Sequence, residues 1–435
     1  MSSPLERTGS APTRELPETS PHPAPDWRRV ARLMLISRKV DEIEETRLVP
    51  EKKVLYQFSA RGHDLAQILL GLQLTDEHDA ANGYYRSRPL LFALGLSIED
   101  AFAGPMARSG GFSDGRDIGV VFNYPNPGGP ILLPMGGGVG SQFTPAAGWA
   151  QAIRYRHETL GESDYVKSIA VALGGDGSVA TNGFWSALTI ATTLELPLLF
   201  YIEDNGYSIS VPGHLQTPGA NIAENLASFK NLHVLDGEGT APEQAARLIG
   251  ESVAHVRARK GAALLRLAVP RLSGHSAQDT QAYKSEALIR EERARDPLPK
   301  LRELIVPDVL SQAQWSALEK EVEREVEAAL ERAMARPQPD VDRVTRHVFC
   351  ERREHDTPDL QVRGGVAPEN HEFPPSSREA APEPQRINML TAIRRTLAHE
   401  LATNPKLVVF GEDVGPKGGV HAATLGLQEK FGEAR

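Results

Sequence analysis

Asp176 and Asn205 have the side chains and the spacing that most clearly indicate chemistry in this sequence. Asp176 lies between two glycines, in Gly175-Asp176-Gly177, and Asn205 follows 29 residues later, in Asp204-Asn205-Gly206-Tyr207. Carboxylate, amide and backbone carbonyl oxygens are hard ligands, and a few of them leave positions on Mg²⁺ for phosphate and water. Glycines let the backbone approach a diphosphate closely, and the start of a following helix offers amides to the same anion. The pattern predicts a magnesium–diphosphate site.

The elements around this pair would place both side chains at one edge of a sheet. Residues 168–173 form a short apolar run that is typical of a buried strand, and residues 197–202 form a second one. Between them, residues 183–195 carry apolar side chains at helical spacing. Because a strand–helix–strand unit has parallel strands that end on the same edge, Asp176 and Asn205 are expected to be neighbours where such folds bind ligands.

Two further motifs give the chain a resemblance to a known family. Tyr84-Tyr85-Arg86 precedes the Gly175 motif, and Gly274-His275-Ser276 follows it, with Asp279 and Tyr283-Lys284 after the histidine. In this order, the motifs resemble the thiamine-diphosphate-dependent decarboxylating component of the 2-oxoacid dehydrogenase complexes. The resemblance implies an α/β protein with a three-layer, parallel-sheet thiamine-diphosphate-binding fold.

The resemblance also implies a role for each residue at a matching motif position. The metal ligands would be Asp176, Asn205 and the backbone carbonyl of Tyr207. The residues in contact with thiamine diphosphate would be Tyr85, Arg86, Gly137, Val139, Gly177, Ser178 and His275. His275 would also be the catalytic residue, assisting proton transfer or acyl transfer. Ser141 and Gln142 match positions that line a K⁺ site in some members of the family.

The residues themselves leave alternatives open. Arg86 could be a surface residue, and Tyr85 and Val139 could pack in the core. The sequence also departs from the family pattern, and two of the departures change the charge near the site. Asp204 stands where the resemblance implies an asparagine and would add negative charge, and Glu203 stands where some relatives have an arginine that touches phosphate. The histidines without ligand-like spacing are interpreted as structural; they are His63, His78, His214, His233 and His255.

Composition excludes several classes of protein. The 435 residues include 57 acidic and 48 basic side chains, which give a net charge of −9, and no block of five basic residues suggests nucleic-acid binding. Cys350 is the only cysteine, so an internal disulfide is impossible. No apolar run is long enough to span a membrane, and we expect a cytoplasmic protein.

Changes in composition along the chain, together with the resemblance, predict four regions. Residues 1–25 are rich in Ser, Thr, Pro and Glu and are expected to be a disordered leader. Residues 26–345 would form the α-type domain that binds the diphosphate and Mg²⁺. Residues 346–385, rich in proline and charge, would be a linker. Residues 386–435 resemble the beginning of a β-type, pyrimidine-binding domain and would be the start of a second α/β domain.

Further elements are expected on either side of the central unit. Helices are predicted at 30–40, after Gly62, and at 241–259, 286–304, 312–335, 387–401 and 424–431. Strands are predicted at 262–268 and 406–410, while residues 81–142 show little periodicity and are expected to be irregular. By the family pattern, the glutamate that acts on the cofactor pyrimidine would lie beyond Arg435, so this chain would hold half of an active site.

The implied activity is oxidative decarboxylation of a 2-oxoacid, with acyl transfer to the lipoyl group of a partner acyltransferase. A branched-chain 2-oxoacid is favoured, with pyruvate next. The cofactors would be thiamine diphosphate and Mg²⁺, with K⁺ at the site that Ser141 and Gln142 match, and the partners would include a β-type subunit or domain in an oligomer. The alternatives are a transketolase-like enzyme, a truncated inactive assembly or regulatory partner, and a Mg²⁺-dependent nucleotide-binding domain.

Overall fold

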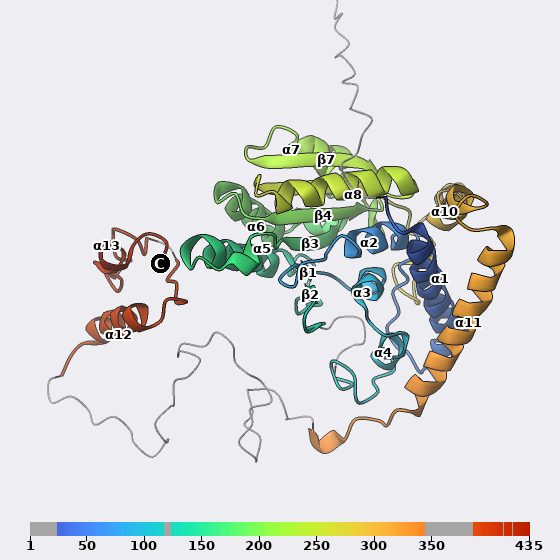
Figure 1. The fold of residues 1–435 in the computed structure, drawn as a ribbon, viewed down its shortest axis with the longest axis horizontal. Coiled ribbons are helices and arrows are strands. Elements are labelled where there is room, and N and C mark those ends of the chain that lie inside the picture. The colour runs from blue at the N-terminus through green and yellow to red at the C-terminus, as the bar shows by residue number, and fades with distance from the viewer. Residues whose placement is uncertain (1–23, 117–122, 344–385, 412, 420) are drawn as a thin grey trace, which may run out of the picture. The chain divides into compact units, whose positions relative to one another are not determined.

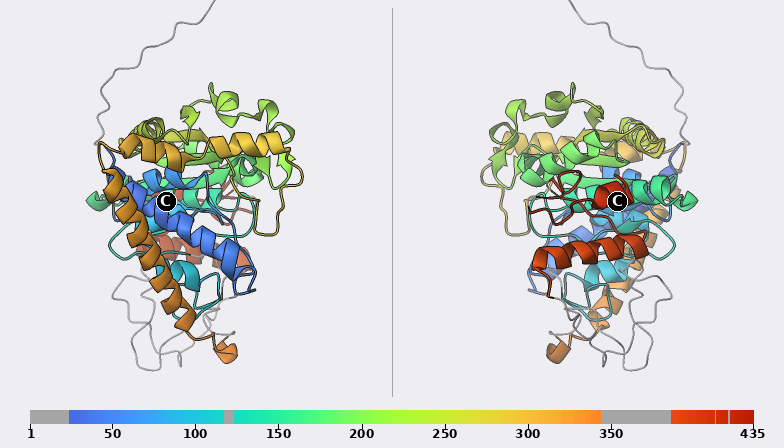
Figure 2. Two further views of the ribbon diagram at one scale, coloured as in Figure 1. Left: turned by 90° about the vertical axis from the view of Figure 1, so that its right-hand side faces the viewer. Right: turned by 90° about the vertical axis from the view of Figure 1, so that its left-hand side faces the viewer.

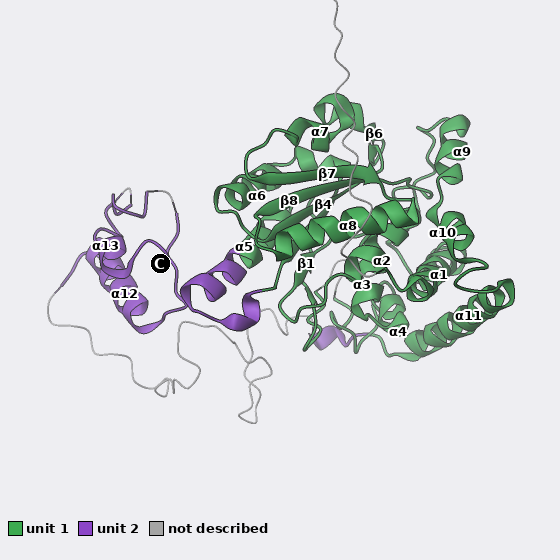
Figure 3. Cartoon of the chain, turned by 45° about the horizontal axis from the view of Figure 1, so that its top comes forward, with its two compact units in different colours: residues 1–150, 167–338 green, residues 151–166, 339–435 purple. Residues whose placement is uncertain are grey.

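The computed structural model describes residues 24–116, 123–343, 386–411, 413–419 and 421–435 (Figure 1). The predicted linker at 346–385, and residues 1–23 of the predicted leader, lie outside the described residues. The described residues divide into two compact units, one made of residues 1–150 and 167–338 and the other of residues 151–166 and 339–435 (Figure 3). None of the helices in the described part of the chain is both long and apolar enough to cross a membrane.

A six-stranded parallel sheet lies at the centre of the first unit (Figure 1). Its strand order is β2-β1-β3-β4-β8-β7, so the chain starts in one half of the sheet and crosses to the other. The strands, in this spatial order, are β2 (Ile131–Leu132), β1 (Ala80–Asn82), β3 (Ala170–Gly175), β4 (Leu198–Asp204), β8 (Ala262–Ala268) and β7 (Leu232–Glu238). A separate two-stranded antiparallel ribbon joins β5 (Tyr207–Ser208) to β6 (Val211–Pro212).

Helices cover both faces of the sheet, which gives the three layers that the resemblance implied. Successive side chains of a strand point to opposite faces, and in β3 Ala170 and Ala172 pack in one core while Val171 and Leu173 pack in the other. One core includes residues of α1 (Trp27–Ile43), α2 (Asp64–Gly71), α3 (Arg88–Leu94), α8 (Pro242–Arg257), α10 (Pro297–Ile305) and α11 (Gln312–Ala335). The other includes residues of α5 (Phe143–Arg154), α6 (Asn182–Thr193) and α7 (Ile222–Leu226). Helix α11 packs across α1 on the outside of the first layer (Figure 2).

The predicted strand–helix–strand unit is confirmed as β3, α6 and β4, with ends that differ by two residues or fewer. Gly175 lies opposite Glu203 in the parallel register, so Asp176 and Asn205 follow neighbouring strands at the same edge, as expected. The prediction of one continuous helix at 286–304 is wrong. The segment is two helices, α9 (Glu286–Ala294) and α10, because Asp296 caps the second helix and Pro297 occupies its first position.

Residues 81–142 are less irregular than predicted. They contain α3, α4 (Ile98–Ala103) and β2, each too short for a periodic pattern to stand out. In the second unit the predicted helices appear as α12 (Met389–Thr403) and a shorter α13 (Leu427–Phe431). The predicted strand at 406–410 is wrong: no neighbouring strand is available to it among the described residues, and its Val409 N–H donates to the carbonyl of Arg435. The predicted domain boundaries stay predictions.

A buried carboxylate ties β1 to the strand beside it. Asp79, which is fully buried, accepts hydrogen bonds from the backbone N–H groups of Thr75, Asp76 and Ile169. Arg257, at the end of α8, donates to both carboxylate oxygens, at 2.8 and 3.1 Å. Arg257 is therefore the charge partner that makes burial of this carboxylate tolerable.

Replacing Arg257 should leave a buried charge without a partner. We expect Arg257→Ala to lower the free energy of unfolding by about 3 kcal/mol, measured by urea denaturation. Arg247→Ala is the matched control on the same helix, because the Arg247 side chain is 42% exposed and pairs with Glu251 one turn away. The control should change stability by less than about 0.5 kcal/mol. Equal losses in the two variants would contradict the assignment.

Candidate functional site

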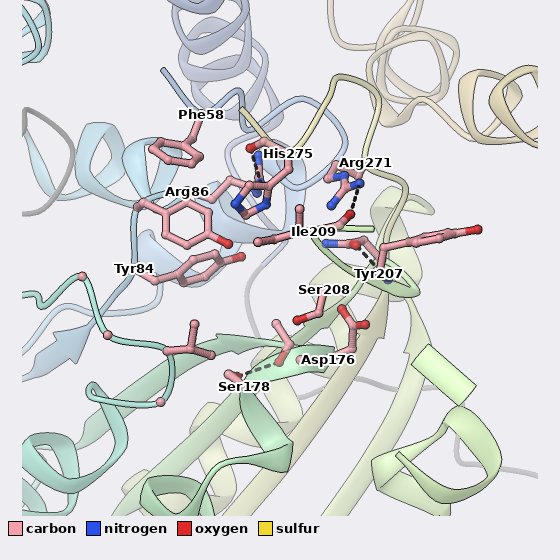
Figure 4. A pocket seen from close by; sticks show the side chains of 18 of the residues that line it. Phe58, Tyr84, Arg86, Asp176, Ser178, Tyr207, Ser208, Ile209, Arg271 and His275 are labelled. Atoms are coloured by element: carbon pink, nitrogen blue, oxygen red, sulfur yellow. Dashed lines mark hydrogen bonds between the residues drawn. The ribbon is translucent and has the colours of Figure 1, made fainter. Parts of the chain in front are cut away.

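One cavity of about 620 Å³ lies at the carboxyl edge of the sheet, where the loops that follow β1, β2, β3, β4 and β8 meet (Figure 4). The ten site residues predicted from the sequence all line it: Tyr85, Arg86, Gly137, Val139, Asp176, Gly177, Ser178, Asn205, Tyr207 and His275. These residues come from segments up to 190 positions apart, and the parallel sheet brings them together. Their chemical roles stay predictions.

Asp176 and Asn205 provide the oxygen donors expected of a metal site. Asp176 is 6% exposed, and its Oδ2 atom has no hydrogen-bond partner among the residues that the structure describes. Gly206 makes the tight turn after Asn205 possible, with φ at +76°. In the described part of the chain, no cluster of three or more His, Cys, Asp or Glu could hold a metal ion. A cation would therefore depend on mixed donors, and a buried carboxylate oxygen without a partner fits that requirement.

Burial raises the pKa of Asp176 to about 7, and the nearby carboxylate of Asp204 contributes to the increase. A buried carboxylate without a neighbouring cation holds its proton more tightly because the ionised form loses its hydration. The ionised form of Asp176 is therefore unfavourable without a neighbouring cation. A bound cation would reverse this effect.

Two arginines provide the positive charge of the cavity. Arg86 is buried and donates to the carbonyls of Ser59 and His275, the latter at 3.1 Å. Arg86 is therefore not the surface residue that the alternative interpretation proposed. Arg271 is also buried and donates to the carbonyl of Ile209 at 2.8 Å and to the hydroxyl of Tyr283. Within the described part of the chain, its Nε atom has no hydrogen-bond partner. Burial lowers the pKa of Arg271, and repulsion from Arg86 adds to this effect.

Arg271 belongs to none of the motifs that the sequence shows. Its signal was its position, three residues after the end of β8 and therefore at the same sheet edge as the other site residues. Two buried guanidinium groups that lack a full complement of acidic partners favour an anion, and their planar donor sets suit phosphate or carboxylate.

His275 lies opposite Asp176 across the cavity, beside Phe58 and Arg86 (Figure 4). Its ring makes edge contacts with Phe58 and Tyr85, at centroid distances of 5.5 and 5.4 Å. Burial lowers the pKa of His275 to about 4, with a contribution from Arg86 and Arg271, so the imidazole is neutral near pH 7. Asp279 fixes the loop by accepting hydrogen bonds from the His275 N–H and the Tyr283 hydroxyl, both at 2.6 Å.

The two departures from the family pattern have structural explanations. Asp204 accepts a hydrogen bond from Gly206 N–H and pairs with Arg266 at 2.7 Å, so the extra negative charge has its own cationic partner. Glu203 is fully buried and accepts hydrogen bonds from Gln67 and Tyr84, each at 2.8 Å. Glu203 is not among the residues that line the cavity.

The remaining predicted residues form the walls of the cavity. Val139 is 66% exposed, so the interpretation of it as core packing is wrong. A side chain at Gly177 would place its Cβ 1.8 Å from the Ser208 hydroxyl, so only glycine fits there. Gln142 is buried and donates to the carbonyl of Leu173 at 2.9 Å, while Ser141 is exposed. The K⁺ site stays a prediction.

Comparisons with known proteins place the chain near the alpha subunits of 2-oxoacid dehydrogenases in sequence. A family model described as "Dehydrogenase E1 component" matches residues 31–342. The chain is 26% identical to 2-oxoisovalerate dehydrogenase subunit alpha of Bacillus subtilis, over 61% of this chain and 78% of the relative. It is 24% identical to pyruvate dehydrogenase E1 component subunit alpha of Porphyra purpurea, over 64% and 80%. It is 28% identical to 3-methyl-2-oxobutanoate dehydrogenase subunit alpha of Mycobacterium tuberculosis, over 53% and 59%.

The raised pKa of Asp176 predicts a pH dependence for the metal-free protein. Between about pH 4 and pH 7 the folded state keeps a proton that the unfolded state has lost, so this group lowers stability as pH rises. We expect Asp176→Asn to be more stable than the wild type at pH 8, by on the order of 2–4 kcal/mol, and similar to it at pH 4. Urea denaturation of the two proteins, with a chelator present, measures the free energy of unfolding at each pH. Parallel pH profiles for the two proteins would contradict the prediction.

Proposed function

This chain belongs to the dehydrogenase E1 component family, and we propose that it acts in thiamine-diphosphate-dependent oxidative decarboxylation of a 2-oxoacid. The relatives named above are alpha subunits of 2-oxoacid dehydrogenases. One observation carries the proposal. A single cavity combines a buried, unpartnered carboxylate oxygen of Asp176 with the buried guanidinium groups of Arg86 and Arg271. That combination suits a diphosphate with its divalent cation.

The donor set determines which residues would hold the cofactor. Asp176, the Asn205 amide oxygen and the Tyr207 carbonyl would bind Mg²⁺, and Arg86 would bind the diphosphate. Gly177 and Ser178 lie just after β3 and would bring the backbone close to the same anion. Thiamine diphosphate supplies the group that stabilises negative charge on the substrate carbon, and the protein supplies orientation and electrostatics.

His275 would act as a neutral base in the cavity. Its lowered pKa, about 4, keeps the imidazole unprotonated at neutral pH, with a lone pair that can accept a hydrogen bond or a proton. An anion beside Arg86 and Arg271 would offset their repulsion and raise this pKa toward neutral pH. Asp279 restrains the loop, and the edge contacts with Phe58 and Tyr85 restrain the ring. We propose that His275 assists acyl transfer to the lipoyl group of a partner acyltransferase.

The finer assignments rest on resemblance. A branched-chain 2-oxoacid is the favoured substrate, with pyruvate next, and relatives with both kinds of name match the chain. A β-type subunit or domain would complete the active site in an oligomer, residues 386–435 would be the start of such a domain, and the enzyme would be cytoplasmic. A transketolase-like enzyme would share the magnesium–diphosphate site, but the family model that matches is that of the E1 component.

The metal ligands can be tested by substitution. We expect Asp176→Ala and Asn205→Ala each to abolish Mg²⁺-dependent binding of thiamine diphosphate, measured by calorimetry on the native protein with any subunits that accompany it. The reason is that each change removes one of few protein ligands of the cation. Asp308→Ala is the control, because this acid is exposed and distant in sequence from the site. Tight, metal-dependent binding by either site variant would overturn the assignment.

The role of His275 predicts a separation of binding from turnover. His275→Ala should bind thiamine diphosphate with nearly wild-type affinity, while the rate of lipoyl acylation falls by about 10²-fold or more. The two quantities are measured by calorimetry and by a lipoyl-domain acylation assay. Unchanged acylation would remove His275 from the mechanism, and lost cofactor binding would reassign it to the binding site.

A further inference from the structure

A chain of polar side chains is buried behind the predicted metal ligands. It consists of Tyr84, Gln67, Glu203 and His63, which we call the Glu203 network. Gln67, Glu203 and His63 are fully buried, and Tyr84 lines the cavity (Figure 4). The network comes from three separate segments: the start of α2, the loop after β1, and the end of β4.

Glu203 is the centre of this network. Its Oε2 atom accepts hydrogen bonds from Gln67 Nε2 and from the Tyr84 hydroxyl, both at 2.8 Å. Its Oε1 atom accepts no hydrogen bond from any described residue but lies 3.4 Å from Nδ1 of His63. Oε2 is therefore already supplied with two donors, and His63 Nδ1 is the group placed to serve Oε1.

This arrangement selects one tautomer of His63. A carboxylate beside one ring nitrogen favours the proton on that nitrogen, so Nδ1–H faces Glu203 and Nε2 carries the lone pair. His63 Nε2 lies 3.5 Å from Nδ2 of Asn205. Nε2 is thus an acceptor directed at the amide nitrogen of a predicted metal ligand.

We propose that Glu203 and His63 are positioning residues that orient the side-chain amide of Asn205 so that its oxygen serves the cation. The two ends of an amide have nearly the same shape, so shape alone does not decide which end faces the metal site. Before a cation binds, hydrogen bonds set this orientation. His63 Nε2 accepts the amide N–H, and the Asn205 oxygen already lies on the side of the Tyr207 N–H, at 3.2 Å. This inference rests on the proposed function, because it assumes that Asn205 binds Mg²⁺.

The experiment compares three variants by the Mg²⁺ concentration that half-saturates thiamine diphosphate binding in calorimetry. His63→Leu removes the acceptor, and this concentration should rise by about 10-fold or more. His63→Gln puts an amide oxygen near the place of Nε2, so it should stay within about threefold of the wild type. Glu203→Gln keeps the shape of the side chain but places an N–H group beside Nδ1 of His63, so the His63 proton moves to Nε2. The half-saturating Mg²⁺ concentration should then rise as it does in His63→Leu.

The outcomes separate a positioning role from a packing role. The proposal is supported if Mg²⁺ affinity falls in His63→Leu and Glu203→Gln but stays close to the wild type in His63→Gln, and if all variants have similar metal-free melting temperatures. Equal loss in both His63 variants would overturn it, because the ring would then act by its volume alone. Wild-type affinity in Glu203→Gln would also overturn it. If the wild type itself shows no Mg²⁺-dependent binding, the proposed function fails first, and the positioning role falls with it.

Discussion

The register between β3 and β4 is the constraint on which the site depends. Gly175 lies opposite Glu203, so Asp176, one residue after Gly175, and Asn205, two residues after Glu203, reach the same edge of the sheet. Because side chains alternate between the two faces, a slip of one residue would send the core residues of a strand to the wrong layer. Both faces of these strands are packed against helices, which makes such a slip costly. Packing of the core therefore sets the spacing of the metal donors.

Charge in the cavity is arranged around a ligand of mixed sign. Arg86 and Arg271 are the basic residues among those that line it, and Asp176 is the acidic one. Burial raises the pKa of Asp176 and lowers that of Arg271, which means that each charge is costly in the protein without a counter-ion. A cation beside Asp176 and an anion beside the arginines would remove both costs at once. The complex of Mg²⁺ with a diphosphate has this distribution of charge.

The central part of the fold could be predicted from the sequence because it depends on local pattern. Strand β8 has the predicted bounds, and β3, α6 and β4 are displaced by two residues or fewer. Strand β7 was missed: it is an edge strand with polar residues such as His233 and Asp236, so it lacks the apolar run of a buried strand. The break in the predicted helix at 286–304 lies at Asp296-Pro297, a cap and first position that mark a helix start, but the charge pattern continues across it and masks the break.

The site was only partly predictable, for a different reason. Asp176, Asn205 and His275 belong to short motifs, whereas Arg271 is recognisable only once β8 is known to end beside β4. The Glu203 network joins residues more than 100 positions apart and leaves no local pattern. His63 was interpreted as structural because no spacing marks it as a ligand, and its contacts place it behind the ligands instead.

The same network explains how a glutamate can occupy a position where some relatives have an arginine. A carboxylate at 203 that faced the diphosphate would repel it. Here the carboxylate is fully buried, is engaged by Gln67 and Tyr84, and lies outside the cavity lining. A change of charge at this position therefore need not abolish anion binding, because Arg86 and Arg271 keep their places. The glutamate instead comes within reach of His63, and through it of Asn205.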